Sequence, residues 1–280
     1  MIGRRTLANG IGAEGVALHA GVRTRIRFSP APPESGIVFR RAGAAADVPA
    51  LWNHVSPERL NTTLAAGGTT IKLVEHVMAA LAGAEIDDCY IEVDGPEPPI
   101  LDGAAAAYLE LLDQAGVREH GGEREAYRVA SVIEVAEDDA RAALRPAARP
   151  EFRFEIEFAE TGRQMIDWIF TPAAFRTEIA PARTFGRIED RDRYAAAGYG
   201  RGADLTNTLV FEGGRLLNPE AQRFPDEFVR HKVLDAVGDL KLAGKPILGR
   251  FEGHRSSHRL NNALLRALFA DPANYETVAA

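Results

Sequence analysis

The two halves of this chain follow the same order of elements, and this internal repeat is the strongest constraint on its fold. Each half shows strand patterns, then a helix pattern that ends in Leu-Ala-Gly at residues 81–83 and 242–244, then a short strand and another helix. The strands show period-2 alternation, as at 152–158, whereas the helices follow the 3.6-residue period. Sequence identity between the halves is low, so the evidence for the repeat is the order of elements. We predict a duplicated α+β unit in which the two helix layers face each other.

A polar segment separates the two halves. Residues 118–126 read Arg-Glu-His-Gly-Gly-Glu-Arg-Glu-Ala and contain a Gly-Gly pair, which favours a linker. We therefore expect an N-terminal α+β domain over 1–120 and a C-terminal α+β domain over 126–280. Helices are predicted over 71–82, 104–115, 226–243 and 258–270, with Gly83 as a left-handed residue that ends the first.

The bulk composition excludes several classes of protein. The 280 residues carry a net charge of −7, so the chain lacks the basic footprint of a nucleic-acid-binding protein. Arg23, Arg25 and Arg27 alternate along a predicted strand and form either a local basic patch or, as we expect, a solvated strand face. The single Cys89 excludes an intrachain disulfide. No apolar run approaches the roughly 18 residues of a spanning helix, and we expect the N-terminal residues not to act as a signal peptide. We expect a soluble monomer of a reducing cytoplasm.

Metal-type ligands occur on the predicted helix of each half. His231 and Asp235 are four residues apart, which places them one turn apart on one helix face. With His76 they form a two-histidine, one-carboxylate set that leaves a position open for water, the pattern of a catalytic zinc site. Iron(II) fits the same ligand set. Glu75, next to His76, is a natural general base.

Each of these motifs has a second interpretation. A His-x-x-x-Asp pair also occurs on solvated helices, and Glu75-His76 also fits a polar stripe on an alanine-rich helix. His258 precedes the last predicted helix and fits either a cap or the second titratable group that amide hydrolysis needs. Thr184 is either an ordinary loop residue or a hydroxyl donor to an oxyanion.

Taken together and in order, the motifs resemble one family, the zinc-dependent UDP-3-O-acyl-N-acetylglucosamine deacetylases of lipid A biosynthesis. The likeness covers essentially the whole chain. It rests on the segments 15–21, 74–83, 99–103, 182–186, 224–240 and 257–262. The resemblance implies two α+β domains packed in the order sheet, helix, helix, sheet, which agrees with the internal repeat.

The resemblance also implies a role for each site residue. It implies that His76, His231 and Asp235 bind zinc, and that Glu75 is the general base. His258 matches the residue that stabilises the oxyanion and protonates the amine, Asp239 the residue that contacts His258, and Thr184 the oxyanion threonine. The implied substrate is a UDP-N-acetylglucosamine bearing an acyl chain, and its expected contacts are Lys232, Phe185, His19 and Arg255.

Several positions depart from the family pattern. The usual Ser-Thr before Val-Glu-His is Lys72-Leu73 here. The loss of that serine removes a capping-box residue, and the charge of Lys72 is expected to lower the pKa of Glu75. Ser257 replaces a usual glycine, Arg259 a small residue and Ala104 a serine.

The largest departure is the segment 187–210, which in the family forms an apolar passage for the fatty acyl chain. Here it begins Arg-Ile-Glu-Asp-Arg-Asp-Arg. These charges either face solvent or change the passage, because unpaired charges are unfavourable against a lipid chain. We therefore predict a zinc deacetylase that releases acetate from UDP-3-O-(3-hydroxyacyl)-N-acetylglucosamine. The alternatives are a related deacetylase for an N-acetyl sugar nucleotide without the acyl chain, and a non-catalytic zinc-binding regulatory protein.

Overall fold

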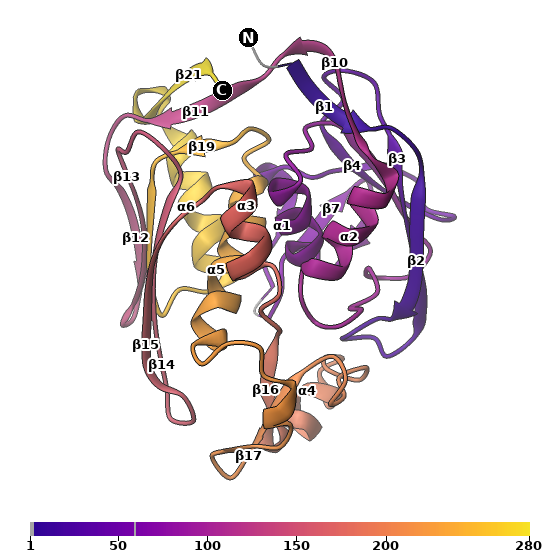
Figure 1. Ribbon diagram of the computed structural model, residues 1–280, viewed down its shortest axis with the longest axis vertical. Helices are drawn as coiled ribbons and strands as arrows, with labels where there is room; N and C mark the ends of the chain where they lie inside the picture. The colour runs from indigo at the N-terminus through magenta and orange to yellow at the C-terminus, as the bar shows by residue number, and fades with distance from the viewer. Residues whose placement is uncertain (1–2, 59) are drawn as a thin grey trace.

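Two sheets form the outer layers of the protein, and the helices lie between them (Figure 1). This computed structural model describes residues 3–58 and 60–280. The arrangement confirms the predicted α+β fold and the order sheet, helix, helix, sheet. Among the described residues, no helix has both the length and the apolar character needed to cross a membrane.

The N-terminal half is built on a five-stranded sheet with α1 and α2 on its inner face. Its strand order is β2-β3-β9-β4-β5. The elements are β2 (Ile11–Val16), β3 (Arg23–Pro30), β4 (Ile37–Arg41), β5 (Val48–Pro49), β9 (Cys89–Val93), α1 (Glu75–Gly83) and α2 (Ala106–Ala115). A small sheet precedes α1 and contains β6 (Val55–Ser56), β7 (Thr63–Ala66) and β8 (Thr69–Ile71).

The C-terminal half is built on a second five-stranded sheet covered by α5 and α6. Its strand order is β12-β13-β20-β14-β15. The elements are β12 (Ile133–Glu137), β13 (Ala140–Arg145), β14 (Glu151–Phe158), β15 (Gly162–Ile169), β20 (Arg250–His254), α3 (Pro172–Ala174), α5 (Glu227–Lys241) and α6 (His258–Ala270). Phe152, Phe154 and Ile156 of β14 are buried on one face, as their alternation predicted.

The two large sheets have the same topology. In each, the first two strands are antiparallel, the fifth strand in chain order inserts between the second and third, and its pairing with the third is parallel. In each half the inserted strand, β9 or β20, is preceded by α1 or α5 and followed by α2 or α6. The structure therefore confirms the duplicated unit predicted from the order of elements.

The predicted linker, residues 118–126, is folded into strands. β10 (Val117–Glu123) pairs with β1 (Gly3–Leu7), and β11 (Glu125–Val129) pairs with β21 (Tyr275–Ala279) and β19 (Ile247–Leu248). The backbone groups of this polar segment thus find hydrogen-bond partners in strands near both ends of the protein, β1 and β21. We keep the division into domains 1–120 and 126–280 as a proposal.

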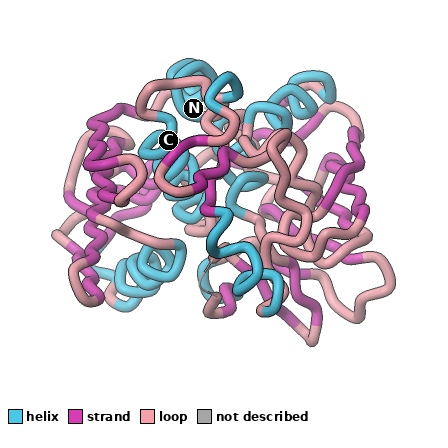
Figure 2. Tube along the Cα trace, turned by 90° about the horizontal axis from the view of Figure 1, so that it is seen from below, coloured by secondary structure: helices cyan, strands magenta, loops and turns pink. Residues whose placement is uncertain are grey.

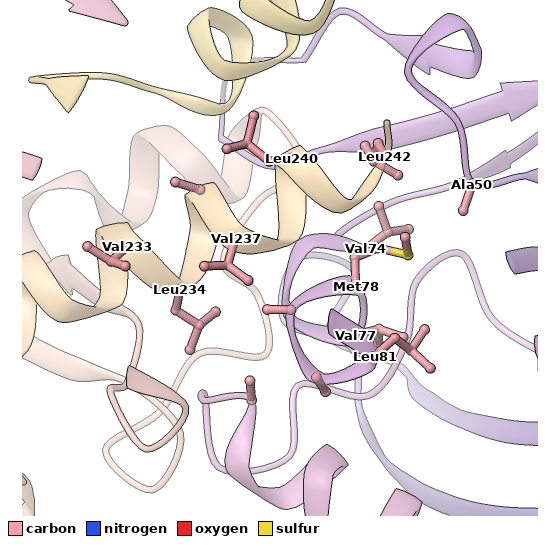
Figure 3. Packing of buried hydrophobic residues seen from close by; sticks show 14 of the residues in the cluster. Ala50, Val74, Val77, Met78, Leu81, Val233, Leu234, Val237, Leu240 and Leu242 are labelled. Atoms are coloured by element: carbon pink, nitrogen blue, oxygen red, sulfur yellow. The ribbon is translucent and has the colours of Figure 1, made fainter. Parts of the chain in front are cut away.

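α1 and α5 pack against each other at the centre of the molecule. Gly238 of α5 makes their closest approach, since a Cβ atom there would lie 2.0 Å from the carbonyl oxygen of Glu75. Figure 3 shows Val77 and Leu81 on the side of α1 that faces away from α5. The prediction of Gly83 as a left-handed residue was wrong, because Gly83 is the last residue of α1 and its φ is not positive. A glycine is needed there for close packing, since a Cβ would lie 2.3 Å from the ring of Phe175.

A small subdomain projects from the end of the helix layers (Figure 1). It contains β16 (Phe185–Arg187), α4 (Arg191–Ala196), β17 (Leu209–Glu212) and β18 (Arg215–Leu216). Figure 2 shows this end of the molecule from below. Residues 187–210 of this subdomain, called the insert below, are hydrogen-bonded to the N-terminal half. The amide of Arg201 donates to the oxygen of His19, and the amide of Gly202 donates to the oxygen of Leu18.

Candidate metal centre and active site

Three ligand-type side chains from the two central helices meet in the buried core. His76 comes from α1, and His231 and Asp235 come from α5. Asp235 Oδ1 lies 3.7 Å from His76 Nε2 and 3.5 Å from His231 Nε2. One ligand atom from each residue lies within 4.8 Å of the others. The cluster joins the two halves of the chain, and it can only form where α1 packs on α5.

The chemistry of these three donors fits a divalent metal ion. His231 Nδ1 bonds the oxygen of Ala182 at 3.0 Å, which leaves Nε2 as the free nitrogen, and Asp235 Oδ1 is buried without a hydrogen-bond partner among the described residues. Burial lowers the pKa of His76 to about 3 and also lowers that of His231, so both imidazoles are neutral. Burial opposes ionisation of Asp235, but the charges of Lys232 and His258 outweigh it and hold its pKa well below the usual range.

Glu75 and His258 face each other beside the cluster. His258 Nε2 lies 3.6 Å from Glu75 Oε1 and 3.8 Å from Asp235 Oδ2. Burial raises the pKa of Glu75 to about 8, and only part of this is offset by His258. Burial opposes the charge of His258, yet Asp239 and Glu75 outweigh it and raise its pKa to about 9. His258 is therefore a cation at neutral pH, positioned to give up a proton.

A buried hydrogen-bond network holds these two groups in place. Asp239 Oδ2 bonds His258 Nδ1 at 3.0 Å and accepts from Asn261 Nδ2 at 2.8 Å, while Asp239 Oδ1 accepts from the Thr62 hydroxyl. The Thr62 amide donates to Glu75 Oε2 at 3.0 Å. Both oxygens of Asp239 and Oε2 of Glu75 therefore have hydrogen-bond partners within the site.

The structure brings some of the other predicted site residues to the cluster. Lys232 Nζ donates to Asp235 Oδ2 at 2.6 Å, and the ring of Phe185 lies 6.1 Å from that of His231. Thr184 directly precedes Phe185 and is anchored by its amide to the oxygen of Gly103 at 2.8 Å. Arg255 lies apart, since its guanidinium pairs with Asp139 and, at 2.6 Å, with Glu157.

His19 lies under the insert. Its Nδ1 accepts a hydrogen bond from the amide of Gly200 at 3.3 Å, and its ring packs edge-on to Tyr199 with centroids 5.1 Å apart. His19 Nε2 is therefore the nitrogen that carries hydrogen in the neutral ring, and it is buried without a partner among the described residues. Burial lowers the pKa of His19 to about 4, so the ring is neutral.

Two departures from the family pattern can now be interpreted. The prediction that Lys72 lowers the pKa of Glu75 was wrong: burial raises that pKa, and the ammonium group of Lys72 lies 5.5 Å from the ring centroid of Tyr199. Ser257 caps α6, because its hydroxyl accepts from the amide of Leu260 at 3.3 Å.

The charges of the insert face solvent. Arg193 donates to Asp190 at 2.7 Å with its side chain 69% exposed, and Arg187 lies 3.1 Å from Glu160 with its side chain 51% exposed. Asp192 is 92% exposed and pairs with Arg191. Paired, exposed charges of this kind do not line an interior passage, which supports the first of the two interpretations of this segment.

Sequence patterns alone missed two residues of the site, Thr62 and Gly238. Thr62 lies in Asn-Thr-Thr, which carries no catalytic signature, and its role depends on contacts with residues far along the chain. Gly238 carried a weak signal, because a glycine inside a helix pattern indicates close packing.

Comparison with known proteins agrees with this geometry. The sequence profile of the family "LpxC: UDP-3-O-acyl N-acetylglycosamine deacetylase" matches residues 4–270. A UDP-3-O-acyl-N-acetylglucosamine deacetylase from Phenylobacterium zucineum (strain HLK1) is 46% identical over 92% of this chain and 90% of its own. Proteins of the same name from Myxococcus xanthus (strain DK1622) and Xanthomonas oryzae pv. oryzae (strain PXO99A) are each 41% identical over 99% of this chain, and over 90% and 94% of their own. This chain therefore belongs to the UDP-3-O-acyl-N-acetylglucosamine deacetylase family.

Proposed function

We propose that this protein hydrolyses the N-acetyl group of UDP-3-O-(3-hydroxyacyl)-N-acetylglucosamine and releases acetate, as a zinc-dependent step of lipid A biosynthesis. The observation that carries the proposal is the placement of a buried carboxyl, Glu75, and a buried imidazolium, His258, within 3.6 Å of each other beside a His-His-Asp cluster. The name shared by the relatives supports the choice of substrate.

The zinc would be held by His76, His231 and Asp235, three protein ligands that leave one position open. When bound, zinc supplies a Lewis acid that polarises the acetamide carbonyl and makes a nearby water more acidic. Iron(II) is the second candidate for the same ligand set, and metal analysis of the purified protein distinguishes the two.

Glu75 is the proposed base. Burial raises the pKa of Glu75 to about 8, and a divalent cation held by the adjacent His76 would favour its ionised form. Its Oε2 is fixed by the Thr62 amide, so Oε1 is the oxygen that takes the proton from water. The water oxygen then bonds to the acetyl carbon, and the Thr184 hydroxyl and the imidazolium of His258 stabilise the oxyanion.

His258 is the proposed acid. Its Nδ1 is held by Asp239 at 3.0 Å, which orients the ring and favours its charged form. Nε2 gives its proton to the sugar nitrogen as the carbon–nitrogen bond breaks. The products are acetate and the free amine, and the proton on Glu75 restores the imidazolium through the 3.6 Å contact or by way of solvent.

The test is zinc-dependent acetate release from UDP-3-O-(3-hydroxyacyl)-N-acetylglucosamine. Glu75→Gln is the matched control, since it keeps the shape of the side chain and all three ligands but removes the base. We expect release by the wild type, and a loss of about a hundredfold or more in kcat in the variant with zinc still bound. Near-normal turnover by Glu75→Gln would contradict the mechanism.

The same experiment separates the alternatives. Release only from an N-acetyl sugar nucleotide without the acyl chain would indicate the related deacetylase. Zinc binding without release from either substrate would indicate the non-catalytic protein.

A further inference from the structure

A cavity of about 310 Å³ lies beside the C-terminal turn of α5, against the inner face of the C-terminal sheet. Its walls include Leu144, Phe152 and Phe251 from the sheet, Phe170 after β15, and Leu240 from α5. None of the proposed metal ligands or catalytic residues lines it. The cavity is therefore separate from the site described above, and its walls suit a hydrocarbon chain.

One buried cation lines this cavity without a partner. Lys241, the last residue of α5, is 7% exposed, and its ammonium group makes no hydrogen bond or ion pair within residues 3–58 and 60–280. The other cations of the lining are paired: Lys245 donates to Glu125 at 2.5 Å, and Arg124 donates to Glu85 at 2.8 Å. An unpaired buried charge is unfavourable, so this amine provides a binding energy for an anion.

The two carboxylates whose charges act on Lys241, Asp87 and Asp88, are already engaged. Asp87 accepts from Arg124 Nε at 3.1 Å, and Asp88 pairs with Arg4 at 2.7 Å. Burial lowers the pKa of Lys241 to about 8, an effect that Asp87 offsets only in part. Lys241 is thus still largely charged at neutral pH, and no carboxylate among the described residues forms an ion pair with it.

We infer that this cavity binds a medium-chain fatty acid, with its carboxylate on Lys241 and its hydrocarbon chain against Phe152, Phe251 and Leu240. A small hydrated anion does not fit the apolar walls, and a neutral hydrocarbon leaves the ammonium group unpaired. A single-chain carboxylate satisfies both parts of the cavity at once. The inference does not depend on the proposed deacetylation, because no catalytic group takes part.

The chain contains its own reporter for this binding. The ring centroid of Trp168 lies 5.9 Å from that of Phe152 and 5.8 Å from that of Phe170, and both phenylalanines line the cavity. The chain has two tryptophans, so Trp52→Phe leaves Trp168 as the single emitter. Titration of this protein with laurate below its micellar concentration is expected to give a saturable change in Trp168 emission with one site per chain.

Substitutions at two lysines locate the carboxylate. Lys241→Met keeps an apolar side chain of similar length but removes the charge, and it is expected to raise the Kd for laurate at least tenfold. Lys241→Arg keeps the charge, so its Kd for laurate is expected to stay closer to that of the parent protein. Lys245→Met is the matched control, because it removes a paired cation from the same lining, and its Kd is expected to stay within twofold. Dodecylamine, with the opposite head charge, is expected not to bind.

Three results would overturn the inference. They are the absence of a saturable signal, equal binding by Lys241→Met and Lys245→Met, and binding of dodecylamine as tight as that of laurate. Displacement of laurate by the acylated UDP-sugar would likewise overturn it, since the chain would then lie in the catalytic cleft. All of these measurements are made without turnover, so they are independent of whether the protein deacetylates a sugar.

Discussion

The hydroxyl group of Thr62 donates a hydrogen bond to Asp239 Oδ1 at 2.5 Å in the buried site. The hydroxyl also accepts from Asn262 Nδ2 at 3.1 Å, so its single hydrogen is directed at Asp239. The amide of the same residue bonds Glu75. Thr62 therefore connects the carboxylate that orients the proposed acid with the proposed base, although it lies in neither ligand helix.

Thr62→Val removes the hydroxyl group and keeps both the shape and the amide. Hydrogen bonds to charged groups contribute about 1.5–3 kcal/mol, so we expect kcat to fall by about tenfold or more while KM changes little. Steady-state kinetics check this, and Thr62→Ser is expected to restore most of the rate. A change confined to thermal stability would show that Thr62 is merely structural.

Gly238→Ala tests the close approach of the central helices. The added Cβ would lie 2.0 Å from the Glu75 oxygen, so α1 and α5 have to move apart. We expect a loss of about 1–3 kcal/mol in the free energy of unfolding and, because the base shifts, a fall in kcat of tenfold or more. Denaturant unfolding and kinetics measure the two effects. Gly121→Ala, where the nearest atom is 3.8 Å away, is expected to change neither by much.

Removal of the metal should lower both the thermal stability of the protein and its activity. A ligand that binds only the folded state at a hundred times its Kd stabilises it by about 2.7 kcal/mol. We expect chelation to lower Tm and abolish acetate release, and added zinc to restore both. His231→Ala should show no response to chelation, whereas His254→Ala, which alters a partly exposed histidine 3.5 Å from Glu155, should respond like the wild type.

The stability of the protein should depend on pH through Lys241. The folded pKa is about 8, below the ordinary value of 10.5, so the unfolded chain holds more protons between these values and stability rises with pH there. At pH 7 the full cost of burying the charge is present, about 3 kcal/mol at most. Lys241→Met is therefore expected to be more stable than the wild type at pH 7, with the difference shrinking toward pH 10.5 in urea titrations. A difference that does not change over this range would contradict the assignment.

The exposed charges of the insert should have little effect on substrate binding. Arg193→Gln removes an ion pair whose arginine is 69% exposed, and such pairs contribute about 0–1 kcal/mol. We expect KM for the acylated substrate to stay within twofold. Phe185→Ala, which removes a ring 6.1 Å from that of His231, is expected to raise KM more strongly. A larger rise in KM for Arg193→Gln than for Phe185→Ala would indicate that the charged segment lines the acyl passage.

Sequence patterns predicted those features that depend on local chemistry. The period of the apolar residues located α5 and α6 within two residues, and the order of elements predicted the duplicated α+β unit. Sequence patterns did not predict features that depend on contacts with residues far along the chain. Residues 118–126 form strands because β1 and β21, from the two ends of the chain, pair with them, and nothing in their own sequence shows this. Lys72 is three residues from Glu75 in sequence, but its ammonium group lies against Tyr199 of the insert.

The division of the proposed ligand set between α1 and α5 has a consequence for how activity arises during folding. His76 belongs to the first structural repeat, and His231 and Asp235 to the second. Neither repeat alone holds enough ligands for the metal or a complete acid–base pair. We therefore expect a nascent or half-folded chain to be inert toward amides, because the proposed hydrolytic centre forms only when both repeats have docked.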